Sequence, residues 1–140
     1  MYHHSLHRAA AAVLGLSVLA ACKKTAPPPA QAPLQVASVD LGRQIGPDNR
    51  VVQPMTSFGV NDTIYASVAT TGTATSAVLT AKWTYQTGQT VDSTTMTISP
   101  TGPAQTEFHI MKASPWPAGG YTLAIWLNGQ SAGQKAFEVK

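Results

Sequence analysis

From residue 34 to residue 140, no segment repeats apolar residues every three or four positions, which is the spacing that an amphipathic helix needs. Threonine and valine are abundant in this region, and glycine or proline interrupts it at short intervals. β-Branched residues favour strands, whereas glycine and proline favour the turns between them. The sequence therefore predicts an all-β domain over residues 34–140.

The expected strands are short segments in which apolar and polar residues alternate. In residues 77–86, Leu79 and Trp83 are expected on one face and Lys82 on the other. Asn128-Gly129 is the strongest turn signal, because both residues tolerate the positive φ angles of a two-residue hairpin. The segments expected as strands are residues 35–41, 51–58, 63–70, 77–86, 90–98, 105–111, 121–128 and 134–139. Pro54 makes 51–58 irregular, so about seven strands are expected in an antiparallel β-sandwich, with a small barrel as the alternative.

Two aromatic residues and one turn resemble features of the immunoglobulin-like superfamily. Trp83 stands where that family has its core tryptophan, on the third main strand. Tyr121, just after Gly119-Gly120, is similar to the tyrosine that opens the penultimate strand and bonds back across the corner. The cysteine pair of antibody domains is missing, because Cys22 is the sole cysteine. The resemblance implies an immunoglobulin-like β-sandwich that is not of the antibody type, and it implies no chemistry.

The first 22 residues resemble the signal of a bacterial lipoprotein. Residues 1–8 carry one fixed side-chain charge, and the uncharged run 9–21 is too short to span a hydrocarbon core of ~30 Å. Leu19-Ala20-Ala21-Cys22 is similar to a lipobox. This resemblance implies cleavage before Cys22, a thiol joined to diacylglycerol and an acylated amine, which together anchor the protein in a membrane. The alternative is an ordinary signal peptide with an incidental cysteine, or a small buried thiol.

Residues 22–33 are expected to link the lipid to the domain. After Cys22 the sequence KKTAPPPAQAP has four prolines and no large apolar residue, so it favours extended polyproline II. Such a tether holds the domain roughly 35 Å from the lipid. Lys23 stands where lipoproteins retained in the inner membrane carry aspartate, so the resemblance implies the outer membrane, with the domain facing the periplasm. The expected organisation is a signal peptide (1–21), a lipidated tether (22–33) and a sandwich (34–140).

Charge and the scarcity of reactive side chains argue against nucleic-acid binding and catalysis. Residues 34–140 contain six Lys or Arg and six Asp or Glu, with no basic run that would suit a nucleic acid. Three of the four histidines, His3, His4 and His7, lie in the segment expected to be removed. His109 remains, on the solvent face of an expected strand, without the second histidine or cysteine that a zinc site or nucleophile pair needs. The chain is therefore expected to be no enzyme and to bind no metal and no cofactor.

Two tryptophans are the candidates for a binding surface. Alternation in residues 121–128 turns Trp126 outward, where it can meet a partner strand or a sugar face. Its expected neighbours on that face are Thr80, Lys82, Thr84, Gln134 and Ala136. Alternatively, the N-terminal segment covers Trp126, or the indole packs under the Lys82 stem. Trp116, between two prolines, is either a rigid contact tip or a plug that closes one end of the core.

The expected function is protein–protein interaction by a non-catalytic lipoprotein of the cell envelope. The alternative is a module that binds carbohydrate or peptidoglycan through the same tryptophans. A third possibility is a proteinase inhibitor that presents residues 114–119.

Overall fold

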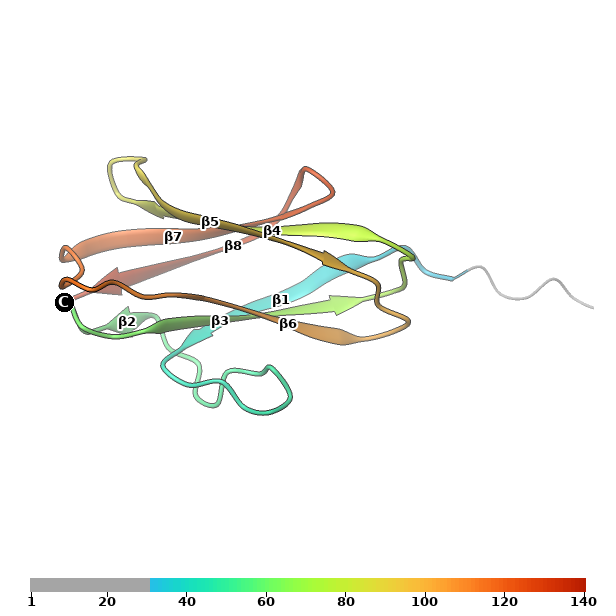
Figure 1. Cartoon of the computed structure of the whole chain (residues 1–140), viewed down its shortest axis with the longest axis horizontal. Helices are drawn as coiled ribbons and strands as arrows, with labels where there is room; N and C mark the ends of the chain where they lie inside the picture. The colour runs from blue at the N-terminus through green and yellow to red at the C-terminus, as the bar shows by residue number, and fades with distance from the viewer. Residues whose placement is uncertain (1–30) are drawn as a thin grey trace, which may run out of the picture.

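The computed structural model describes residues 31–140, which fold into two stacked β-sheets (Figure 1). The strands are β1 (Gln35–Gly42), β2 (Ser57–Phe58), β3 (Ile64–Thr71), β4 (Ala77–Tyr85), β5 (Thr90–Ile98), β6 (Ala104–Ile110), β7 (Gly119–Leu127) and β8 (Gln130–Val139). One sheet has the order β1-β3-β6 and the other β2-β8-β7-β4-β5. The predicted β-sandwich is confirmed, and the alternative of a closed barrel is wrong because each sheet keeps its own edge strands. In this part of the chain there is no helix, hence none that spans a membrane.

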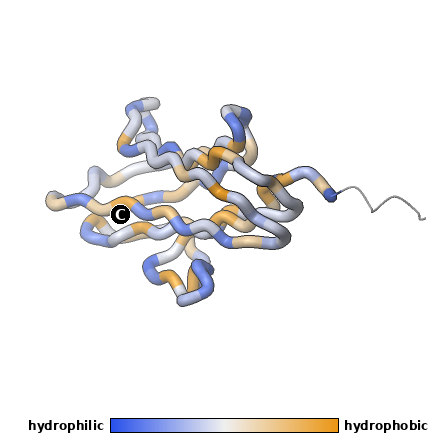
Figure 2. Tube along the Cα trace, turned by 45° about the vertical axis from the view of Figure 1, so that its right-hand side comes forward, coloured by the Kyte–Doolittle hydropathy of each residue, from blue (hydrophilic) through white to orange (hydrophobic). Residues whose placement is uncertain are grey.

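The core lies between the sheets and follows from the alternation along the central strands. In β4 the side chains of Leu79, Ala81 and Trp83 are fully buried, and in β7 Leu123 and Ile125 are fully buried. Figure 2 shows the most hydrophilic stretches in the loops that project from the sheets. The core is built within residues 31–140, a length at which domains commonly fold unaided.

Aromatic rings fill one end of this core. Phe137 lies against three of them: Tyr121 stacks on it at 5.2 Å between ring centroids, and Trp83 and Phe58 meet it edge to face at 5.9 and 5.6 Å. The Tyr121 hydroxyl donates a 2.7 Å hydrogen bond to the Pro117 carbonyl, four residues upstream. Trp83 and Tyr121 thus occupy the core and corner positions that the sequence predicted for them.

One expected strand, 51–58, is largely absent. Only Ser57–Phe58 forms a strand, which pairs in parallel with the end of β8. The preceding chain loops across the outer face of β3, where the Ser67 hydroxyl donates a 2.7 Å hydrogen bond to the Asn49 carbonyl. Pro54 has no N–H for a ladder, and the polar residues around it suit a loop.

The chain joins the sandwich at the turn between β3 and β4. Thr73 N–H donates to the Ala32 carbonyl at 3.1 Å, and the Thr73 hydroxyl donates to the Gln31 side chain at 3.0 Å. Gly72 has a φ of 90° and lies directly against the Pro33 backbone. Residues 31–33 are therefore fixed to this end, which we call the tether end. The lipobox and the rest of the expected tether lie outside the described residues.

Candidate functional site

A groove of about 510 Å³ opens at the end of the sandwich opposite the tether end. It lies between the sheets, where the start of β5 faces the end of β6. β5 contributes Val91 and Asp92, and β6 contributes His109 and Ile110. Met111, in the loop after β6, is 66% exposed beside it. The groove therefore joins two strand edges that are distant in sequence.

Three aromatic side chains form the floor of this groove: Tyr85, Trp116 and Tyr121. The Tyr85 hydroxyl donates to the Ala118 carbonyl at 2.8 Å, as the Tyr121 hydroxyl does to Pro117. Burial first, and the neighbouring Tyr85 second, raise the pKa of Tyr121 above its ordinary value of 10.0. Both hydroxyls thus act as structural donors that hold the β6–β7 loop.

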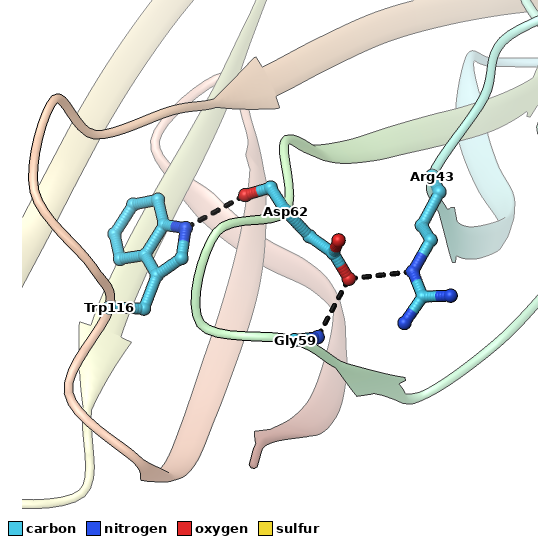
Figure 3. Close-up of polar contacts among 4 residues, drawn as sticks. All are labelled: Arg43, Gly59, Asp62 and Trp116. Atoms are coloured by element: carbon cyan, nitrogen blue, oxygen red, sulfur yellow. Dashed lines mark hydrogen bonds and ion pairs between the residues drawn. The ribbon is translucent and has the colours of Figure 1, made fainter.

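Asp62 fixes the same loop from the other side (Figure 3). Its backbone carbonyl accepts a 2.8 Å hydrogen bond from the Trp116 indole N–H. Its Oδ2 accepts from the Gly59 N–H at 2.7 Å and from Arg43 Nε at 2.6 Å. One residue therefore ties the loop before β3, the arginine after β1 and the β6–β7 loop together.

The rim of the groove carries charges of both signs. His109 Nδ1 lies 2.8 Å from Glu107 Oε1, and the imidazole packs against Tyr65 with 5.6 Å between ring centroids. Lys112 Nζ lies 5.5 Å from the centre of the Trp116 ring, within the range of a cation–π contact. In residues 31–140, no group of three or more His, Cys, Asp or Glu side chains is arranged to hold a metal ion. The groove therefore exposes a mixed surface, more polar than apolar, with Asp92 and Lys112 among its lining residues.

Trp126 lies on the outer face of the five-stranded sheet and is 38% exposed. It stands opposite Thr80 on β4 and opposite Ser131 on β8. Gln134 stands opposite Ala124 on the same outer face, and a register shift between Ile125 and Trp126 makes Ser131 the residue directly opposite Trp126. Alternation thus predicted the direction of Trp126 correctly, but its neighbour on β8 is Ser131, because a bulge cannot be read from the alternation.

Lys82 and the two tryptophans do not form one surface. Lys82 is exposed on the same outer face and pairs with Ala124, so it is a diagonal neighbour of Trp126. Trp116 is 3% exposed and lies at the groove end, so of its two predicted roles the structure has the plug and not the contact tip. Residues 114–119 are held by the Trp116, Tyr85 and Tyr121 hydrogen bonds and present no projecting tryptophan. Cys22 lies outside the described residues.

Sequence reasoning missed the groove. Val91 and Ile110 meet only because β5 and β6 are the neighbouring edges of different sheets. No local pattern in the sequence carries that information. The one available signal was the apolar Met111 at the end of the expected strand 105–111.

No family model and no curated protein matches the sequence. Among solved structures, the sandwich is similar to an immunoglobulin-like protein from Pseudomonas aeruginosa. That match has a TM-score of 0.50 and 14% identity, and covers 79% of this chain and 99% of that chain. The fold is an immunoglobulin-like β-sandwich. This chain is also similar to the C-terminal domain of wzt, with a TM-score of 0.50 and 11% identity. That match covers 80% of this chain and 79% of that chain.

Part of a larger protein also gives a match, with a lower TM-score. An alkylpurine DNA glycosylase from Pseudomonas fluorescens, bound to DNA, matches with a TM-score of 0.48 and 16% identity over 76% of this chain. The match spans only 30% of the glycosylase chain. Identities this low show a shared fold alone, since immunoglobulin-like folds serve many unrelated tasks.

Proposed function

We propose that this chain is a non-catalytic lipoprotein of the bacterial outer membrane, anchored through Cys22, whose immunoglobulin-like domain binds a protein partner in the periplasm. The observation that carries the proposal is the position of the groove at the end opposite residues 31–33. β4 alone runs nine residues between these ends, which is roughly 30 Å at the rise of a strand. A domain tethered at one end presents the groove away from the membrane.

The chemistry of the groove suits a protein partner better than a sugar. Sugar-binding sites stack an open aromatic face against the ring, but Trp116 and Tyr121 are each only 3% exposed. The half-buried Val91 and the exposed Met111 instead offer aliphatic surface, with Asp92 and Lys112 at the rim, while Ile110 is buried. A mixed polar and apolar surface that carries charges of both signs is common in non-obligate protein–protein interfaces.

A photo-crosslinking amino acid at Met111, introduced into the full chain in intact cells, tests the binding function. The matched control places the same group at Gln130, an exposed residue in the hairpin at the tether end. We expect a specific adduct from position 111 and none from position 130. The proposal fails if position 111 gives no adduct, or if both positions give the same adducts.

Metabolic labelling with palmitate tests the anchor separately. The full chain should incorporate the label and fractionate with the outer membrane, whereas Cys22→Ser should lose both properties. If the wild-type chain incorporates no label, the proposed lipid anchor is wrong. The binding function would then be decided by the crosslinking experiment alone.

A second candidate function, carbohydrate binding, is favoured by one observation: the Trp126 indole is the tryptophan with an open face. Tryptophan fluorescence of residues 31–140 during titration with muropeptides tests it. A quench that Trp126→Ala abolishes supports sugar stacking, and an unchanged spectrum removes this candidate.

A further inference from the structure

β5 is a long edge strand with one side unpaired. Within residues 31–140 it pairs with β4 alone, so alternate backbone N–H and C=O groups along its nine residues point away from the sheet. Such an edge is a template for a further strand. Its sequence, TVDSTTMTI, has no proline, lysine or arginine, and its one charged residue, Asp92, lies near its start, so residues 93–98 carry none of the residues that usually protect an edge.

The side of β5 that faces the core is also uncovered. Met96 stands opposite the fully buried Leu79, so its side chain points to the inner side of the sheet. Even so, Met96 is 36% exposed, because the three-stranded sheet does not extend over it. Asp92 stands opposite the fully buried Trp83 in the same way and is exposed in the groove. The inner side of β5 is therefore open at two places, at the groove and at Met96.

The other edges are less open. β2 has only two residues. β1 follows Pro33, which disturbs its start, and has a register shift between Val36 and Ser38. β5 also has a register shift, at its first residues opposite Trp83 and Thr84, but its residues 92–98 stay in regular register. β6 follows Pro103 and bears the Glu107–His109 pair. β5 is thus the edge best suited to accept a strand.

We propose that the partner of this domain inserts an extended peptide segment, which adds to β5 as a sixth strand of the larger sheet. This proposal rests on the proposed function and names the class of partner. The backbone of the added segment pairs with β5, and every second side chain points inward over Met96 and into the groove beside Ile110. Apolar residues fit these positions, and a basic residue fits beside Asp92.

Two other occupants fit poorly. The chain's own residues 23–30 contain three consecutive prolines, which cannot donate to a ladder. Two copies paired antiparallel through β5 would point their tether ends in opposite directions, because Ile98 lies at the tether end of each. Such a pair does not suit two chains anchored in one membrane surface. A partner's peptide has neither restriction.

The test uses residues 31–140 as bait for a phage-displayed library of random twelve-residue peptides, so no natural ligand needs to be known. Selected peptides should alternate apolar and polar residues, and should slow hydrogen exchange of β5 amides on binding. Selection that yields no peptide, or peptides that protect other strands, would overturn the proposal.

Proline substitutions at Thr94 and Thr95 show whether backbone pairing is used. Neighbouring residues of a strand point their N–H groups to opposite sides, so one of these prolines removes a bond to β4 and the other removes only the free donor. The variant that keeps the wild-type unfolding midpoint is the informative one. It should bind the selected peptides at least tenfold more weakly, whereas Trp126→Ala should bind them unchanged.

The outcomes separate this inference from the proposed function. If the informative proline variant keeps full peptide affinity, strand addition is wrong. If the same variant still gives the Met111 adduct in cells, the partner uses the groove without β5, and the proposed function survives alone. Sedimentation equilibrium tests for self-association. If the domain forms a concentration-dependent dimer and this proline abolishes it, the strand added to β5 comes from a second copy, and the proposal of a partner's peptide is wrong.

Discussion

Asp62 connects three segments through a single side chain and its own carbonyl. Its Oδ2 caps the Gly59 N–H and pairs with Arg43, while its carbonyl orients the Trp116 indole. The ion pair is half exposed on the arginine side, so it contributes little by itself. The partly buried bond to Gly59 matters more, because a donor without a partner costs free energy.

We expect Asp62→Ala to lower the free energy of unfolding by about 1–2 kcal/mol, because the Gly59 N–H and Arg43 lose their partner while the backbone bond to Trp116 is kept. Asp48→Ala is the matched control, because Asp48 pairs with Arg50 at 3.5 Å on the surface, and it should cost no more than about 0.5 kcal/mol. Urea unfolding of both variants measures the difference. Equal costs would show that Asp62 does not hold this end together.

The raised pKa of Tyr121 predicts a loss of stability in alkali. The unfolded chain ionises this phenol near its ordinary pKa of 10.0, whereas burial delays ionisation in the folded domain. The neutral phenol therefore contributes its full stability below pH 10, and this contribution is lost as the pH rises above 10. Urea midpoints should fall less steeply between pH 9 and pH 11 in Tyr121→Phe than in the wild type. Identical slopes would contradict this.

At the scale of single elements, the β3–β4 turn holds the tether against the sandwich. Gly72 has a positive φ, and a Cβ there would collide with the Pro33 carbonyl. Gly88, in the β4–β5 turn, also has a positive φ, but a Cβ there would meet open space. An alanine at Gly88 therefore introduces backbone strain alone, whereas an alanine at Gly72 introduces the same strain and also disrupts the contact with Pro33.

Gly88→Ala should cost about 1–2 kcal/mol from the left-handed backbone alone. Gly72→Ala should cost more, and it should make residues 31–33 accessible to proteases because they can no longer lie against the turn. Urea unfolding and limited proteolysis of the two variants provide the measurements. Equal costs together with equal cleavage would show that the contact with Pro33 is unimportant.

Most elements could be predicted from the sequence where alternation is strong. The expected strand 77–86 appears as Ala77–Tyr85, and 90–98 appears unchanged. β8 was predicted to start at residue 134 but starts at Gln130, because its first residues are polar or small and a bulge breaks their alternation. The parallel contact of β2 with β8 had no local signal, since it depends on the path of the whole loop before it.

At the scale of the whole molecule, the tether end and the groove end are separated by the length of the sandwich. If the partner is captured away from the membrane, the tether sets how far the groove extends. Deleting residues 26–30 shortens the reach by roughly 15 Å. We expect at least a twofold lower yield of the Met111 adduct, with no change in domain stability. A five-residue Gly/Ser replacement should retain the yield, and an unaffected deletion variant would argue against a distant partner.

The candidate site was only partly foreseeable at this scale. Trp126 was predicted to face outward because one strand's alternation decides that direction. The groove needs Val91, Ile110 and Trp116 from three separate segments, and their meeting depends on how two sheets stack. Trp116 itself could not be assigned from the sequence, because flanking prolines suit a tip and a plug equally.

The opposite placement of the tether and the groove also decides how the domain bears mechanical load. A partner that pulls at the groove end against an anchor at the tether end stretches the sandwich along its strands. β1 continues directly from residues 31–33 and pairs with β3 over most of its length. The pull then acts in shear, so the hydrogen bonds of the β1–β3 ladder share the force instead of opening one after another. Under the proposed function, this geometry would let the domain transmit tension between its anchor and its partner.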